Sequence, residues 1–126
     1  MMEGRSIVFA LTTTSLAAGG VYTSNWIRVW GPDAGDAAIT DMAIPHDKIR
    51  VLGHCYSDVA SAANGAVVQQ SYDGVNVAYS FAFSAVALTH ETFNALVLSK
   101  HVRIAYTNGV VAQTVFTLVA RLVEEV

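Results

Sequence analysis

The chain has 126 residues, enough for one domain that buries roughly two thirds of the surface its unfolded form would expose. Hydrophobic residues make up 53% of it and charged residues only 13%, against about 25% in typical soluble domains, so we expect other subunits to cover part of its surface. A net charge of −3 with seven scattered Lys and Arg residues excludes the basic field that nucleic-acid binding requires.

The first twenty residues imitate a secretory signal, with Arg5, a short apolar run and small residues near Ala17. Three threonines, at positions 12–14, interrupt the apolar run, and such β-branched residues suit a strand. We therefore interpret residues 7–14 as a first strand, and residues 1–20 as a strand or arm that stays on the chain and is used in subunit contacts. No run reaches the roughly 18–20 apolar residues that span a bilayer, so no membrane role is expected.

A second strand is predicted over residues 22–30, where Trp26, Arg28 and Trp30 share one face. Tyr22, Trp26 and Trp30 are the candidate interaction residues. Exposed rings can stack on sugars, whereas aromatic residues in strands more often form cores or subunit interfaces.

Residues 31–41 contain Gly, Pro and three aspartates, which indicates a loop before a short apolar piece at residues 42–44. The loop acids do not have the ligand spacing of a calcium loop, so we interpret them as solvated; they are Asp33, Asp36 and Asp41.

A third strand is predicted over residues 49–56, where apolar and polar residues alternate, and residues 57–65 are predicted to turn the chain. The lone cysteine, Cys55, cannot form an intrachain disulfide, and we interpret it as a small buried hydrophobe.

Two hairpins are predicted next. Residues 67–72 and 75–85 flank Asp73-Gly74, a pair typical of a two-residue type I′ turn, and Asn108-Gly109 similarly joins residues 101–106 to 110–123. In the first hairpin one face is predicted to build core and the other is small and polar; the core face comprises Val77, Tyr79, Phe81 and Phe83. Between the hairpins, residues 86–99 fit helical spacing or a strand, and we favour a loop and a strand.

About eight short strands with little helix predict a single all-β domain over residues 1–126, built as an antiparallel β-sandwich or a jelly roll.

No catalytic, metal-binding or cofactor-binding residue can be assigned. The histidines lack the partners and spacing of a metal site; they are His46, His54, His90 and His101. No serine lies in a G-x-S-x-G elbow, no glycine-rich loop opens a helix, and the acids lie mostly in predicted loops. We therefore expect a protein that is not an enzyme.

Four segments carry a family resemblance that covers roughly residues 50–121: RVLGHCYSDVA, VVQQSYDGVNVAYSF, HVRIAYTNG and AQTVFTLVARL. They resemble small β-sandwich proteins of tailed bacteriophages and prophages, in which a V-x-Q-S-x-D-G-x-N segment precedes a V-R-I-x-Y-x-N-G hairpin. Such sequences often carry a tryptophan where this chain has Val77. The resemblance implies a virion protein of the head decoration, head fibre or tail-associated class and carries over no catalytic residue.

Two functions follow as hypotheses. The first is a capsid decoration or cement protein, assembled in the host cytoplasm, that forms a trimer or another cyclic homo-oligomer on the major capsid protein or other virion proteins. The second is a tail or fibre module that binds a glycan on the host surface through Trp26, Trp30 or tyrosine-bearing loops.

Overall fold

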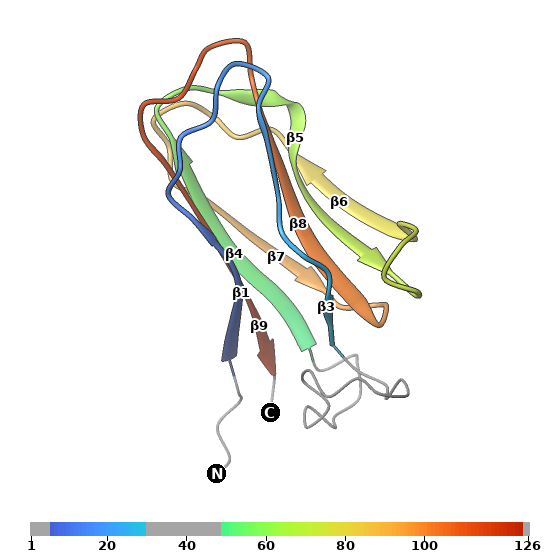
Figure 1. The fold of residues 1–126 in the computed structure, drawn as a ribbon. Coiled ribbons are helices and arrows are strands. Elements are labelled where there is room, and N and C mark those ends of the chain that lie inside the picture. The colour runs from blue at the N-terminus through green and yellow to red at the C-terminus, as the bar shows by residue number, and fades with distance from the viewer. Residues whose placement is uncertain (1–5, 30–48, 125–126) are drawn as a thin grey trace.

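The computed structural model describes residues 6–29 and 49–124, which form two antiparallel β-sheets packed face to face (Figure 1). This part of the chain contains no helix and confirms the predicted β-sandwich. Its nine strands are β1 (Ser6–Thr12), β2 (Val21–Thr23), β3 (Ile27–Arg28), β4 (Ile49–Ser57), β5 (Ser61–Ser71), β6 (Tyr79–Phe83), β7 (Glu91–Leu96), β8 (His101–Asn108) and β9 (Phe116–Glu124).

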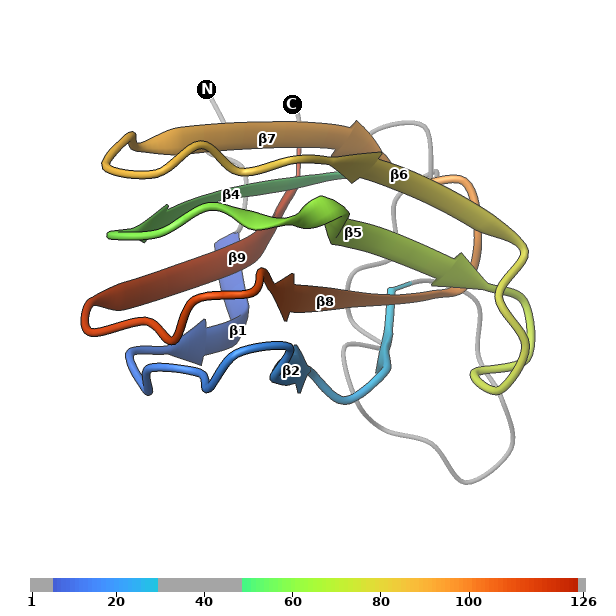
Figure 2. The same cartoon turned by 90° about the horizontal axis from the view of Figure 1, so that it is seen from above.

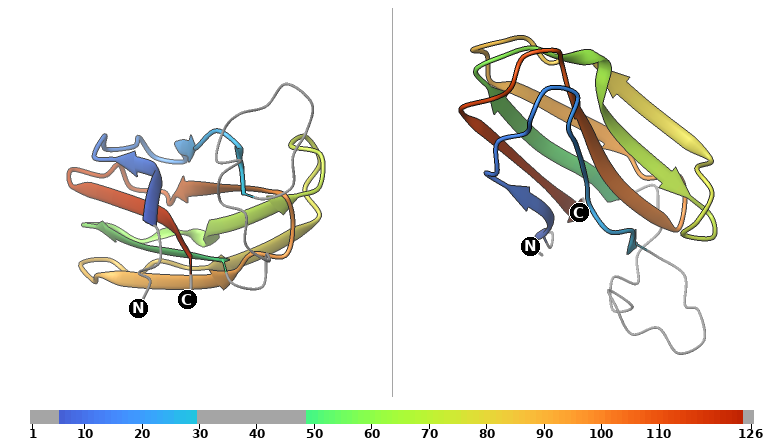
Figure 3. Two further views of the ribbon diagram at one scale, coloured as in Figure 1. Left: turned by 90° about the horizontal axis from the view of Figure 1, so that it is seen from below. Right: turned by 45° about the horizontal axis from the view of Figure 1, so that its top comes forward.

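One sheet has the order β1-β9-β4-β7 and the other has the order β2-β8-β5-β6, with β3 also paired to β8. Seen from above, β1 and β2 lie at one side of the sandwich, and β6 and β7 lie together at the other (Figure 2). Two further views show the same two layers (Figure 3). The side formed by β6 and β7 is therefore an open edge of both sheets.

The core lies between the sheets because each long strand alternates buried and less buried residues, as strand geometry requires. Tyr106 is fully buried, and its ring lies 4.7 Å from that of Phe116 between ring centroids. Cys55 is 1% exposed, as predicted, and burial raises the pKa of its thiol to about 11. The other large, fully buried side chains include Ile49, Ile104, Leu118 and Leu122.

The predicted hairpin around Asn108-Gly109 is wrong. β8 and β9 belong to different sheets, so the chain crosses the sandwich there instead of reversing within one sheet. The buried Asn108 side chain donates hydrogen bonds to main-chain oxygens of Leu16, Ala17 and Val111. Its amide thereby joins the loop after β8 to the loop after β1.

The predicted two-residue turn at Asp73-Gly74 is also wrong, although β5 and β6 do pair as antiparallel neighbours. The last paired residues are Gln70 and Tyr79, so the connection is longer than two residues. Gly74 has a φ of +75°, whereas a type I′ turn would require a positive φ at Asp73 too, and Asp73 is not among the described residues that have one. The Asp73 carboxylate instead accepts hydrogen bonds from the main-chain N–H groups of Val75 and Asn76, both at 2.8 Å.

The remaining strand predictions are confirmed in part. The strand expected at residues 22–30 is interrupted between β2 and β3, and β5 begins at Ser61, inside the expected turn at residues 57–65. This first part of β5 pairs irregularly, since the register of β5 against β8 shifts between Ser61 and Ala66. Residues 86–99 form a loop and strand β7, as favoured. The predicted loop at residues 31–41 and the apolar piece at 42–44 lie outside the described residues.

Candidate interaction surface

The inner face of β6 is only partly covered by the opposite sheet. Tyr79 pairs with Gln70 and Phe81 with Val68, which places both aromatic side chains on the face that carries the core. Yet Tyr79 remains 42% exposed and Phe81 46% exposed, and Val77 is exposed as well. The prediction that this face builds core holds for Phe83, which packs against the core, and is wrong for the other three residues.

Packing of this aromatic row against the core ends at Phe83. β7 is the last strand of the facing sheet, and Phe93 from β7 meets Phe83 with 5.7 Å between ring centroids. Beyond Phe83 the aromatic row continues outside the core, with 6.2 Å between the rings of Phe83 and Phe81. At the tip, Tyr72 and Tyr79 share a hydroxyl–hydroxyl hydrogen bond of 2.9 Å. We call the uncovered residues, Tyr72, Val75, Val77, Tyr79 and Phe81, the β6 surface.

A cleft of about 350 Å³ runs beside this surface between β6 and β7. Gln70 lines it and connects β5 to the chain that follows β7. Its Oε1 accepts from the main-chain N–H of Leu98 at 2.6 Å, and its Nε2 donates to the carbonyl of Leu96 at 2.9 Å. These hydrogen bonds connect the two sheets beside the cleft, and Tyr79 and Phe81 line its β6 side.

The segment that contains β6 is almost free of charge. Between Asp58 and Glu91 the sequence has a single charged residue, Asp73. Edge strands of soluble proteins usually carry charges, prolines or bulges that prevent pairing with another chain. Strand β6 has no proline or charged residue, and its pairing with β5 shows no register shift.

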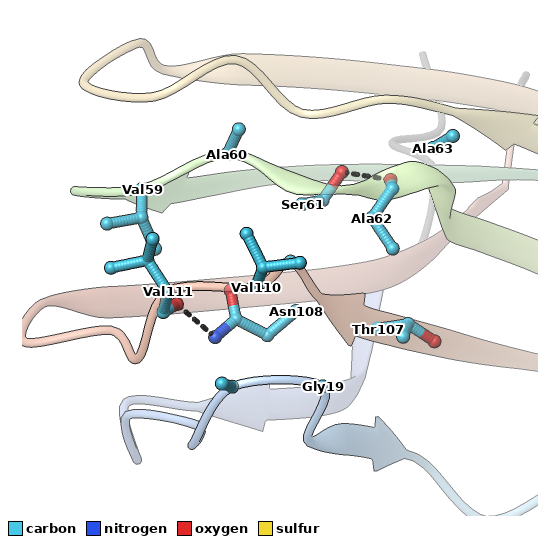
Figure 4. A pocket seen from close by; sticks show the side chains of 12 residues that line it. Gly19, Val59, Ala60, Ser61, Ala62, Ala63, Thr107, Asn108, Val110 and Val111 are labelled. Carbon is cyan, nitrogen blue, oxygen red and sulfur yellow. Dashed lines mark hydrogen bonds between the residues drawn. The ribbon is translucent and has the colours of Figure 1, made fainter.

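A second hollow lies at the loop end of the sandwich. This pocket of about 820 Å³ lies between the start of β5 and the loop after β8, with Gly19 on its other side (Figure 4). Its lining is small and apolar, and Val110 at its mouth is almost fully exposed. Asn108 also lines it, and its amide donates the hydrogen bond to the Val111 carbonyl that Figure 4 marks.

Two aspartates hold the loops that border these surfaces. Hydrogen bonds from the Thr114 hydroxyl and the Val115 main-chain N–H lower the pKa of Asp58, which joins the β4–β5 and β8–β9 connections. Hydrogen bonds from the main-chain N–H groups of Asn76 and Val75 lower the pKa of Asp73 well below its usual range. Both carboxylates therefore bind protons less readily in the folded chain than in the unfolded one.

This difference predicts how stability depends on pH. The contribution of a carboxylate with a lowered folded pKa is fully present above the unfolded value, 3.8, and is lost as the pH falls below it. We expect the urea midpoint to fall between about pH 5 and pH 2, and to fall less in the variant Asp58→Asn, Asp73→Asn. An equally steep fall in that variant would contradict the assignment.

Of the three candidate interaction residues named from the sequence, the structure describes two. Tyr22 is partly buried and packs against the core. Trp26 is also partly buried, and the Arg103 guanidinium lies 4.3 Å from its ring centroid, so one face of this ring is occupied. Trp30 lies outside the described residues. The sequence feature that points to the β6 surface is the segment between Asp58 and Glu91, in which Asp73 is the one charged residue.

Within residues 6–29 and 49–124, no three His, Cys, Asp or Glu side chains gather where they could hold a metal ion. His46 and the loop acids Asp33, Asp36 and Asp41 lie outside these ranges. The same ranges contain no helix long and apolar enough to cross a membrane.

Comparison with known proteins supports the fold. No family model and no curated protein matches the sequence. The crystal structure of the PBSX exported protein XepA is similar with a TM-score of 0.69 and 16% identity, over 97% of this chain and 37% of that one. The chain thus spans little more than a third of that protein. A structure of Bacillus endospore appendages, which form disulfide-linked pili, aligns with a TM-score of 0.43 and 8% identity, over 98% of this chain and 90% of that one. The similarity to XepA shows a shared β-sandwich fold.

Proposed function

We propose that this chain is a structural protein of a bacteriophage particle, without enzymatic activity, and that it acts as a capsid decoration or cement protein. The observation that carries the proposal is the β6 surface, where uncharged aromatic residues on an edge strand remain half exposed. Burying apolar surface stabilises an assembly by about 25 cal/mol per Å². Such a surface suits a protein whose task is to adhere to other subunits.

The similarity to a prophage exported protein supports the phage assignment. In this proposal the copies form a cyclic homo-oligomer, because identical subunits usually close by rotation. The oligomer is assembled in the host cytoplasm and binds the major capsid protein or another virion protein. The half-buried state of Tyr22 and Trp26 gives no comparable support to glycan binding.

The experiment is fractionation of the phage that encodes the chain. A tagged copy is produced during phage growth, and heads, tails and whole particles are separated on a density gradient. We expect the tagged chain to migrate with heads and whole particles, while the same chain without phage stays at the top of the gradient. Migration with tails alone would contradict the decoration role, and absence from every particle fraction would contradict the virion assignment altogether.

A further inference from the structure

The free edge of β6 can pair with a further strand through its main-chain N–H and C=O groups. Within residues 6–29 and 49–124, its main-chain groups on the side away from β5 have no neighbouring strand, because β6 is the last strand of its sheet. A strand edge in this state can be extended by any chain that supplies an antiparallel or parallel partner. The chemistry of the side chains then decides which partner fits.

The two faces of β6 differ in a way that allows a close approach. The inner face carries Tyr79 and Phe81, and the outer face carries the small residues Ser80 and Ala82. All four are exposed. A second strand at β6 would therefore meet no bulky side chain on the outer face, and it would cover the aromatic row on the inner face.

The absence of charge favours a second copy of this chain as that strand. When a surface pairs with itself about a two-fold axis, each side chain near the axis faces its own kind, so a charged residue there would repel its copy. The sequence has no charged residue from Gly74 to His90, and therefore none in β6. Asp73 precedes the strand by several residues, and antiparallel pairing would place the two Asp73 residues at opposite ends of the contact.

We propose that β6 pairs antiparallel with β6 of a second copy about a two-fold axis, so that the two sheets containing β6 become one continuous sheet. This inference rests on the proposed function, because it names the self-contact of the homo-oligomer. The paired segment is about 17 Å long for five residues, which is short for a stable interface. In this proposal, contacts of Val75, Val77 and Tyr72 with the second copy add to the interface area. Because the interface is small, we expect a dimer that forms at high protein concentration.

Cysteine cross-linking tests the geometry directly. Single variants Ala78→Cys, Ser80→Cys and Ala82→Cys place a thiol on the exposed outer side of the segment, with Thr23→Cys on the opposite edge of the same sheet as the control. The native Cys55 adds little background, because it is 1% exposed and burial raises its pKa to about 11. Disulfide-linked dimers are measured on a denaturing gel after mild oxidation.

In an antiparallel pair about a two-fold axis, only residues near the axis lie opposite their own copies. An axis at Ser80 would make Ser80→Cys the fastest of the three variants, and an axis at Phe81 would make Ser80→Cys and Ala82→Cys equal and faster than Ala78→Cys. We therefore expect unequal rates among the three variants, with the fastest at least tenfold faster than Thr23→Cys. Equal rates at all four positions, or a maximum at Thr23→Cys, would overturn the proposal.

A charge introduced at the contact gives a second test. Phe81→Glu would bring like charges together near the axis, and we expect at least a tenfold loss of dimer affinity in sedimentation velocity. The matched control is Val21→Glu on β2, since Val21 is 57% exposed and Phe81 46% exposed, each on an edge strand of the same sheet. Circular dichroism confirms that both variants are folded before they are compared.

The outcomes separate the two proposals. Equal effects of Phe81→Glu and Val21→Glu, or a trimer whose affinity Phe81→Glu does not change, would overturn pairing at β6 and leave the virion role intact. A dimer that depends on Phe81, in a chain that never migrates with phage particles, would support the pairing and contradict the virion role.

Discussion

Replacement of Asn108 by aspartate is expected to destabilise the fold by about 3–5 kcal/mol, although the two side chains have nearly the same shape. Asn108 is 1% exposed, and its Nδ2 lies 2.8 Å from the Val111 carbonyl and 3.0 Å from the Ala17 carbonyl. Aspartate would place a carboxylate oxygen against these acceptors, and no donor would compensate the buried charge.

Urea unfolding at pH 7 and pH 4.5 measures this effect. Asn64→Asp is the matched control, because it makes the same chemical change at an exposed position. Burial would raise the pKa of the new carboxyl at position 108, so the loss of stability relative to the native chain should shrink as the pH falls and the carboxyl is protonated. A loss no greater than that of Asn64→Asp would show that the Asn108 amide does not hold the loops together.

Replacement of Gly53 by valine is expected to cost about 3 kcal/mol, against the general preference of strands for valine. Gly53 lies in β4 directly opposite Phe93 on β7 and Ala120 on β9. A β-carbon at position 53 would overlap the Phe93 ring and the Val119 carbonyl oxygen. Phe93 in turn supports Phe83, so displacement of its ring would also disturb the aromatic row that leads to β6.

A double-mutant cycle isolates the ring contact. Gly53→Ala should cost less in a Phe93→Ala background than in the native chain, because the ring that blocks the new methyl group is then absent. The remaining cost reports the Val119 carbonyl, which both backgrounds retain. If the losses of unfolding free energy in Gly53→Ala and Phe93→Ala sum to the loss in the double variant, the packing of Phe93 over Gly53 is contradicted.

The sequence predicted most strands because alternation of side chains is a local property. It could not predict which strands share a sheet. Asn108-Gly109 is typical of a hairpin, but here the asparagine is needed for its buried amide, and the chain crosses between sheets. Asp73-Gly74 did mark the place where β5 and β6 are joined, yet the Asp73 carboxylate organises a longer loop through main-chain hydrogen bonds that no dipeptide pattern contains.

The candidate interaction surface also depends on contacts between the sheets, which local sequence patterns do not contain. Alternation correctly placed Tyr79 and Phe81 on the inner face of their strand, but whether an inner face is covered depends on how closely the opposite sheet packs against it, and here a cleft remains between β6 and β7. The aromatic residues chosen from the sequence were those near the N-terminus, whereas the exposed aromatic row lies in the segment with almost no charge. A search for charge-free strand segments would have identified it.

Light scattering of the purified, unaltered chain over a wide range of concentrations tests most directly whether this protein works by adhesion to its own copies. We expect the measured mass to rise from the 13.4 kDa of one chain toward a multiple of that mass as the protein concentration increases. A mass of one chain at every concentration, up to the limit of solubility, would contradict it.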